Sequence, residues 1–187
     1  MKLNKVSITI IIAGMIIIAV VIIFFHQIKQ VTTHMITKNY FTIDELCASS
    51  TAKRKGIDNT PPPQVVANLT QLRDKVLNPL REQYGAAIWV HSGYRCPELN
   101  AAVGGVANSQ HIVGEAADID TYSRDNNRKL FEILIAQANF DQIIWEGDGD
   151  WIHVSYKANG YNRGAILAQN PNGGYTNIQS NWQTAIG

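Results

Sequence analysis

The pattern of hydrophobic and polar positions divides the chain into an apolar N-terminal stretch and a longer region of mixed elements. No charged residue occurs from Val6 to Phe25, and a helix of this length, at about 1.5 Å per residue, crosses a hydrocarbon core of about 30 Å. A cleavable signal peptide would have a shorter apolar region followed by small residues, whereas "FFHQIKQ" follows here. The pattern therefore predicts an uncleaved membrane anchor over residues 1–30, followed by a stalk over residues 31–39.

The clearest helix is predicted between residues 65 and 80. Its apolar positions recur every three or four residues, the spacing of a helix face that packs on a core; they are Val65, Leu69, Leu72, Val76 and Leu80. Pro79 is expected to kink or split this helix. A shorter helix is predicted to begin at Thr42, which forms a capping-box pattern with Glu45.

Four short segments have the length and residue types of strands: "AIWVHS" at 87–92, "EAADID" at 115–120, "QIIWE" at 142–146 and "WIHVSY" at 151–156. The segment "EGDGD" between the last two is typical of a hairpin turn. Helices are expected at "PELNAAVGG" and over 126–138. Since the elements show no regular βαβ repeat, the pattern predicts an α+β fold with a mainly antiparallel sheet and flanking helices. This domain is expected to span residues 40–157, and residues 158–187, with weak periodicity, to form a tail of unclear role.

Charge adds an orientation to the predicted anchor. The net charge is +1, and Lys2 and Lys5 precede the apolar stretch, so the positive-inside rule keeps the N-terminus in the cytoplasm. The remaining chain would then face the periplasm or the cell exterior, with residues 6–25 in the lipid bilayer of the cytoplasmic membrane. The sequence contains no basic patch of the kind that would indicate a nucleic acid as partner. In that compartment Cys47 and Cys96 either form a disulfide or remain free thiols, because the sequence gives no separation between them.

The segment "SQHIVGEAADID" from Ser109 to Asp120 contains candidate metal ligands. His111 and Asp118 provide the nitrogen and oxygen atoms that zinc accepts, and a catalytic zinc site uses three protein ligands. Gly114 permits a tight turn between them. His153, in the middle of a predicted strand, is the best third candidate, although a single histidine in a strand is more often a half-buried structural residue.

Three further residues are candidates for chemistry beside such a metal. Asp150 lies three residues before His153, and a carboxylate placed there can take a proton from water and pass it to a leaving amine. Glu146, on the preceding strand, is the alternative. Arg95 can hold a substrate carboxylate or carbonyl through paired hydrogen bonds, or can be an ordinary surface arginine.

Three motifs in this order resemble the zinc D-Ala-D-Ala carboxypeptidase family. They are "SGYRCPELNAAVGG", the pattern S-x-H-x-x-G-x-A-x-D at 109–118, and W-x-H-V at 151–154. That family includes the L-alanyl-D-glutamate endopeptidases of phage lysins, and its zinc site is similar to that of the Hedgehog signalling domain. The resemblance covers most of residues 40–157.

The resemblance implies Zn²⁺ as cofactor, with His111, Asp118 and His153 as its ligands. It implies that Asp150 is the acidic catalytic base, at a position where many members have glutamate, and that Arg95 stabilises the substrate or the developing oxyanion. The implied substrates are the stem peptides of bacterial peptidoglycan, cleaved as a carboxypeptidase or as an endopeptidase. Glu146 stays the reserve candidate for the base.

Two other classes of function remain open. One is a catalytically inactive peptidoglycan-binding or structural module of the same fold, against which the complete set of five site residues argues. The other is a metal-dependent signalling or adhesion domain of the Hedgehog type. The predicted N-terminal membrane anchor agrees better with an enzyme that acts on the bacterial cell wall.

Overall fold

The computed structural model describes residues 19, 21–22 and 38–187 of the chain. Most of the predicted anchor over residues 1–30 and of the stalk over residues 31–39 lies outside these described residues. Within them, no helix combines the length and the apolar character needed to span a bilayer. Residues 39–187 form one compact unit.

Six strands form a single sheet in the order β1-β2-β4-β3-β5-β6. Their bounds are β1 Trp89–Ser92, β2 Ala116–Asp120, β3 Gln142–Glu146, β4 Trp151–Ser155, β5 Ala165–Gln169 and β6 Tyr175–Asn177. All neighbouring pairs are antiparallel except β3 and β5, which run parallel. The predicted α+β fold with a mainly antiparallel sheet is therefore confirmed, including the β3–β4 hairpin around the glycine-rich turn.

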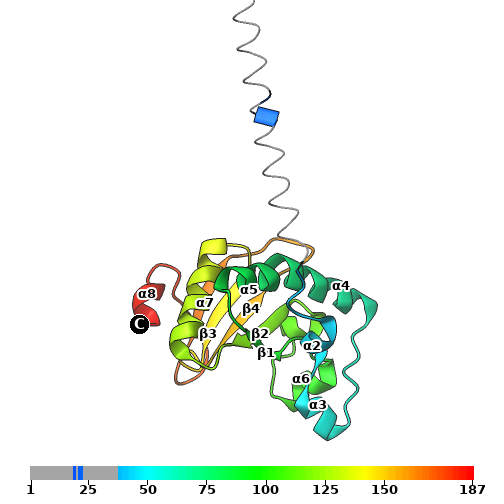
Figure 1. The fold of residues 1–187 in the computed structure, drawn as a ribbon. Helices are drawn as coiled ribbons and strands as arrows, with labels where there is room; N and C mark the ends of the chain where they lie inside the picture. Colours follow the sequence, from blue (N-terminus) through cyan, green and yellow to red (C-terminus); the bar gives the residue numbers. More distant parts are fainter. Residues whose placement is uncertain (1–18, 20, 23–37) are drawn as a thin grey trace, which may run out of the picture. The chain divides into compact units, whose positions relative to one another are not determined.

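Helices α4, α5 and α7 lie together against one face of the sheet (Figure 1). Their bounds are α4 Pro63–Leu72, α5 Asn78–Tyr84 and α7 Arg124–Gln137, and the π-helical segment η1 Arg73–Leu77 joins the first two. Pro79, near the start of α5, has no N–H for the hydrogen-bond ladder. The wider turn before it, in which Asn78 N–H bonds to the carbonyl of Arg73, is the interruption that the sequence predicts.

The remaining helices are short. Helices α2 Ile43–Cys47, α3 Ser50–Lys55 and α6 Pro97–Ala102, with the 3-10 helix η2 Gln110–Val113 and α8 Trp182–Ala185, complete the unit. The Thr42 side chain accepts a hydrogen bond from the N–H of Glu45, which confirms the predicted start of α2. Around β1, helices α2, α3 and α6 gather at one end of the sheet, whereas α8 lies near the other end (Figure 1).

Alternation along the strands separates a core face from a polar face. On the core face, Ile143 and Trp145 of β3 and Ile152 and Val154 of β4 are buried in the cluster that packs on the helices. Successive strand residues point to opposite faces, so the residues between them point away from the helices. The polar face therefore presents Asp118 of β2, Glu146 of β3 and His153 of β4.

Residues 158–187 are part of the sheet and not a separate tail. Strand β5 pairs with β3, and β6 pairs with β5, while Ile166, Ile178 and Ile186 belong to the buried core. The domain boundary drawn at residue 157 therefore differs from the compact unit, which continues to Gly187. The periodicity of this segment is weak because β6 is a short exposed edge strand and contributes few apolar side chains.

Cys47 and Cys96 are free thiols, so of the two possibilities that the sequence left open, the structure has the unbonded one. Burial, with a smaller contribution from the charge of Asp44, raises the pKa of Cys47 to about 11. The Cys96 sulfur accepts a hydrogen bond from the N–H of Leu99 and so caps α6. Both side chains are partly buried and pack against the hydrophobic core.

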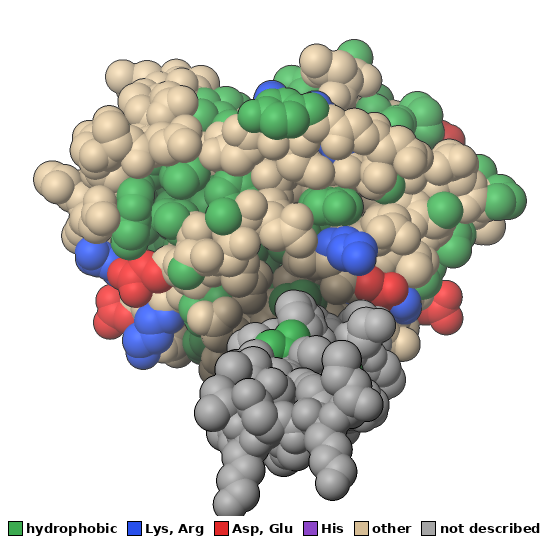
Figure 2. Space-filling view, turned by 90° about the horizontal axis from the view of Figure 1, so that it is seen from above, with side chains coloured by type: hydrophobic (Ala, Val, Ile, Leu, Met, Phe, Trp, Pro, Cys, Tyr) green, Lys and Arg blue, Asp and Glu red, His purple; other side chains and the backbone are tan. Residues whose placement is uncertain are grey.

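Figure 2 shows acidic and basic side chains next to one another near the edges of the molecule. The rest of this face is largely uncharged and includes several hydrophobic patches. Neither sign of charge dominates this face.

Candidate metal centre and active site

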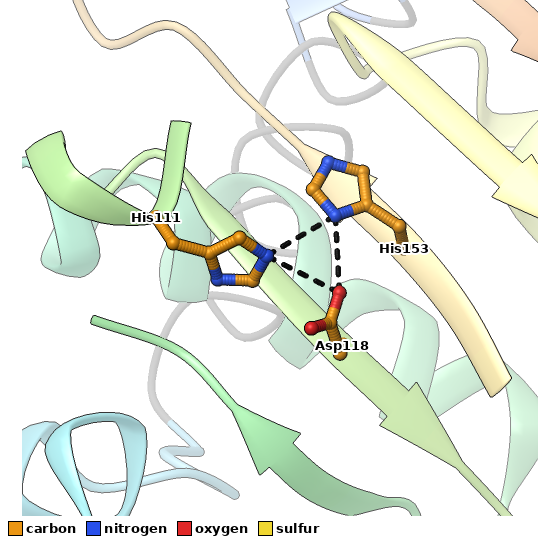
Figure 3. Close-up of side chains that lie close together, drawn as sticks. All are labelled: His111, Asp118 and His153. Atoms are coloured by element: carbon orange, nitrogen blue, oxygen red, sulfur yellow. Dashed lines mark hydrogen bonds and ion pairs between the residues drawn. The ribbon is translucent and has the colours of Figure 1, made fainter. Parts of the chain in front are cut away.

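Three side chains converge on one point above the polar face of the sheet (Figure 3). His111 comes from η2, Asp118 from β2 and His153 from β4. His111 Nε2 lies 3.2 Å from His153 Nδ1 and 3.2 Å from Asp118 Oδ1, and His153 Nδ1 lies 3.0 Å from the same oxygen. Asp118 and His153 are cross-strand partners in the register of β2 and β4. The structure therefore brings together the three residues singled out in the sequence.

The size of this triangle fits a zinc ion. Ligand atoms about 2.0–2.1 Å from a tetrahedral zinc ion lie roughly 3.3 Å from one another. The three separations of 3.0–3.2 Å are close to that edge length. Two imidazole nitrogens and one carboxylate oxygen are also a donor set that zinc accepts. Geometry and chemistry both agree with a three-ligand zinc site that keeps one position open.

The orientation of His111 is fixed by a hydrogen bond on its other nitrogen. His111 Nδ1 lies 2.6 Å from the carbonyl oxygen of Gly93, so Nδ1–H donates there and Nε2 keeps its lone pair for a metal. Gly93 is itself constrained, because a Cβ at this position would lie 2.2 Å from the carbonyl oxygen of Leu46. A glycine is thus required where this carbonyl approaches the histidine.

The short helix η2 sets the position of His111. The Ser109 side chain accepts a hydrogen bond from the N–H of His111, and the helix ends at Gly114 with φ +72°. This left-handed conformation is unfavourable for residues with a Cβ, and a Cβ here would also contact Val65 and Leu69. Gly114 therefore provides the tight turn expected between the histidine and the β2 aspartate.

The electrostatics of the three residues suit metal binding. Burial lowers the pKa of His111, which keeps the imidazole neutral, the form that binds metals. Burial alone would raise the pKa of Asp118, but the adjacent histidines outweigh it and hold that pKa well below its usual range. A neutral histidine and an ionised aspartate are the states that a zinc ion needs.

Arg95 reaches the same site from the loop before α6. Its Nη2 lies 3.4 Å from Asp118 Oδ2, on the carboxylate oxygen that is not part of the triangle. Its Nε is buried and has no hydrogen-bond partner in the described part of the chain. Since an unpaired buried donor is costly, Arg95 has hydrogen-bonding capacity to offer a ligand in the cavity that it lines.

A cavity of about 680 Å³ opens in front of the triangle. The loop from Val103 to Gln110 and the strands β3 and β4 line it, together with Arg95, Lys157, Arg163, Gln169 and Tyr175. A cavity of this size accommodates several residues of a peptide. The site thus combines candidate metal ligands, an arginine and a substrate-sized cleft.

The structure places the two candidate bases differently. Glu146 is buried, lines the 680 Å³ cavity and lies 3.4 Å from the hydroxyl of Tyr175. Burial, together with the charge of Asp118, raises its pKa, although His153 and Tyr175 oppose this shift. Asp150 is exposed on the β3–β4 turn and lines a second cavity, which shares Asp118 and Trp151 with the first. Each carboxylate therefore lines a cavity that also includes Asp118.

Sequence reasoning did not identify the wall formed by residues 157–175. Gln169 accepts a hydrogen bond from the N–H of Gly147 in the β3–β4 turn, and Tyr175 contacts Glu146. Neither residue lies in a motif, and the pairing of β5 with β3 across the sequence had no local signal. The short apolar run "AIL" at 165–167 was an available indication of a strand there.

A model of the peptidase M15 family matches residues 39–155 of the chain. The match includes the three triangle residues, Arg95 and both candidate bases. It ends before the wall that β5 and β6 contribute. No curated protein matches the chain.

Proposed function

The chain belongs to the peptidase M15 family, and from this premise we propose that it is a zinc-dependent peptidase that cleaves stem peptides of bacterial peptidoglycan. The observation that carries the proposal is the triangle of His111, Asp118 and His153, with edges of 3.0–3.2 Å, at the base of a peptide-sized cavity. All three residues line this cavity, in which a substrate peptide would bind.

The three residues would hold zinc, which supplies a Lewis acid for the scissile carbonyl and for water. Asp118 serves two partners, since one oxygen faces the two histidines and the other faces Arg95. Arg95 thereby orients the aspartate, and its remaining N–H groups point to a role in stabilising negative charge on the carbonyl oxygen. The Gly93 carbonyl holds His111 in the required tautomer.

Proton transfer requires a carboxylate that takes a proton from the attacking water and delivers it to the departing amine. We assign this role to Asp150, three residues before His153, and keep Glu146 as the alternative. The second cavity gives Asp150 access to the side of the triangle formed by Asp118. The burial and raised pKa of Glu146 support the alternative, because such shifts often accompany acid–base function.

The proposed location follows from the N-terminal sequence. Residues 6–25 would anchor the chain in the cytoplasmic membrane, with the N-terminus in the cytoplasm and the peptidase domain in the periplasm or outside the cell. Such an anchor would keep the active site in the compartment that contains the cell wall. The peptidase domain would then bind peptidoglycan stem peptides, and residues 6–25 would contact the lipid bilayer.

Mass spectrometry of muropeptides after incubation with the zinc-loaded full chain tests the proposal. Loss of one terminal residue would identify a carboxypeptidase, and two peptide fragments would identify an endopeptidase. Muropeptides of unchanged mass, with zinc bound to the protein, would instead indicate an inactive wall-binding module.

A further inference from the structure

Two basic side chains that line the main cavity lie outside the residues that the family match covers. Lys157 follows β4 and Arg163 precedes β5, and both line the cavity. Arg163 bonds through Nε to both carboxylate oxygens of Asp141, at 3.0 and 3.1 Å, and Lys157 Nζ lies 3.3 Å from Oδ1 of the same residue. Two cations from different segments are thus held side by side.

The shared aspartate fixes both cations without using all their donors. The Asp141 side chain is fully buried, whereas those of Arg163 and Lys157 are 48% and 34% exposed. The Gln110 amide also donates to Asp141. A lysine has three N–H donors and an arginine five, and among the described residues their side-chain contacts use only some of these. The free donors are available to a ligand in the cavity.

The charge of the cavity lining favours an anionic ligand. Three lining residues are basic, namely Arg95, Lys157 and Arg163, and two are acidic, namely Asp118 and Glu146. Asp118 is a proposed zinc ligand, so a bound Zn²⁺ would add two further positive charges at the centre. Glu115 also interacts with Lys157, and burial raises the pKa of this glutamate.

Strand register gives the distance of this pair from the proposed metal. His153 is paired with Ile144, and the next pair on the same face is Ser155 with Gln142, beside Asp141. Lys157 lies two residues further on. At about 3.3 Å per strand residue, the basic pair is roughly 7–13 Å along the sheet from His153. This distance corresponds to about two to four residues of an extended peptide.

We propose that Lys157 and Arg163 form a subsite for a substrate carboxylate about two to four extended residues from the scissile bond. A carboxypeptidase that removes one residue would need its carboxylate subsite next to the scissile carbonyl, where Arg95 lies. The longer spacing of the Lys157–Arg163 subsite fits a peptide that continues on the carboxyl side of the scissile bond, and with the substrate in this orientation the enzyme is an endopeptidase. This inference rests on the proposed peptidase function.

Paired ligands test the subsite by equilibrium binding. The probes are a synthetic peptidoglycan stem peptide with free carboxylates and the same peptide with its carboxylates amidated. Calorimetry would use the zinc-loaded full chain carrying Glu146→Gln and Asp150→Asn, which slows turnover. Amidation is expected to weaken binding by roughly tenfold or more, because bonds between charged groups are the stronger kind.

Adding Lys157→Gln should reduce this effect of amidation to less than about threefold. The variant leaves the Arg163–Asp141 contacts in place, so the buried aspartate keeps a partner. Lys129→Gln is the matched control: it removes one lysine from the exposed surface of α7, outside the cavity, and should leave the amidation effect unchanged. Arg163→Lys, with the melting temperature checked, gives a second test that keeps the charge but loses the paired geometry.

Equal binding of both peptides in the presence of Lys157 would overturn the subsite, as would an equal loss for both peptides on Lys157→Gln. Cleavage by the otherwise unaltered chain is measured separately, and its absence would contradict the proposed function without affecting the binding result. Removal of a single terminal residue from the free peptide would overturn the endopeptidase assignment.

Discussion

Asp150 and Glu146 are two carboxylates beside one triangle, and substitution separates their roles. Asp150→Asn removes the proposed base and keeps the side-chain size, so kcat should fall by about 10²–10⁴-fold while zinc content stays near that of the unaltered chain. Asp150→Glu should retain part of the activity, since many members of the zinc D-Ala-D-Ala carboxypeptidase family have glutamate at this position. Initial rates on muropeptides and zinc analysis of the same samples give the measurement.

Glu146→Gln is the comparison for this prediction. An active Asp150→Asn enzyme together with an inactive Glu146→Gln enzyme would transfer the role of base to Glu146. Loss of zinc from Asp150→Asn would show instead that Asp150 is a ligand or a structural residue.

The ionised Asp141 carboxylate is expected to stabilise the fold at neutral pH and to lose this contribution in acid. Burial alone would raise its pKa, but its bonds to Arg163 and Lys157 lower this pKa to about 2. A lowered pKa stabilises the fold above the usual value near 3.8, and this stabilisation is lost as the pH falls from about 4 to about 2. Since one pKa unit corresponds to about 1.4 kcal/mol, the loss is roughly 2 kcal/mol.

Unfolding free energies of the metal-free chain across this pH range, compared with those of Asp141→Asn, provide the measurement. The variant should be less stable at pH 7 and show a shallower fall below pH 4. Parallel curves for the two proteins would contradict the assignment.

At the residue scale, the site residues that could be predicted from the sequence are those that lie in local motifs. His111, Asp118 and His153 could be found because the turn at Gly114 and the residue types of zinc ligands leave a local pattern. Lys157 and Arg163 could not, because their association depends on Asp141, which is far from both in the sequence and has no motif of its own.

At the scale of elements, Asn127 joins the start of α7 to the β3–β4 turn. Its amide group donates to the Asp120 side chain and to the carbonyl oxygens of Gly149 and Asp150, and it accepts from the N–H of Thr121. The residue is 1% exposed. The turn that carries Asp150 is therefore held by one buried amide on a helix.

Asn127→Ala should destabilise the fold by about 2–4 kcal/mol, because it leaves several buried polar groups without partners. It should also lower kcat by releasing the Asp150 turn, with zinc content little changed. Chemical denaturation and rate measurements test both effects. Asn126→Ala, on the same helix and only partly buried, is the control, and an equal loss in the two variants would argue against a special role for Asn127.

The sequence predicted element types better than their ends. Helix α7 begins two residues before the predicted start, because the Ser123 side chain caps it by accepting a hydrogen bond from the N–H of Asn126. The spacing of apolar residues, on which the prediction was based, does not reveal this cap. The interruption near Pro79 was predictable from proline chemistry, whereas no local pattern predicts its form as a π-helical segment.

At the scale of the whole molecule, residues 158–187 are predicted to be needed for folding. Ile166, Ile178 and Ile186 are each at most 5% exposed in the core. Burying a large aliphatic side chain contributes about 1.5–3 kcal/mol, so losing three removes an amount comparable to the stability of a whole domain. A chain ending at Lys157 should lack a cooperative thermal transition by circular dichroism.

A cooperative transition near that of the full chain would restore the sequence-based boundary at residue 157. That boundary was drawn where local periodicity ends. The structure continues because β5 pairs in parallel with β3, and no local pattern in the sequence predicts that pairing.

The central claim is that His111, Asp118 and His153 form a zinc site, and elemental analysis tests it most directly. The full chain, dialysed after loading, should retain about one zinc ion per molecule, as expected for three ligands and one open position. His111→Ala should lose most of this zinc, whereas His91→Ala, which removes a histidine bonded to Asp120 outside the triangle, should retain it. Full zinc retention by His111→Ala, or no zinc in the unaltered chain, would contradict the account.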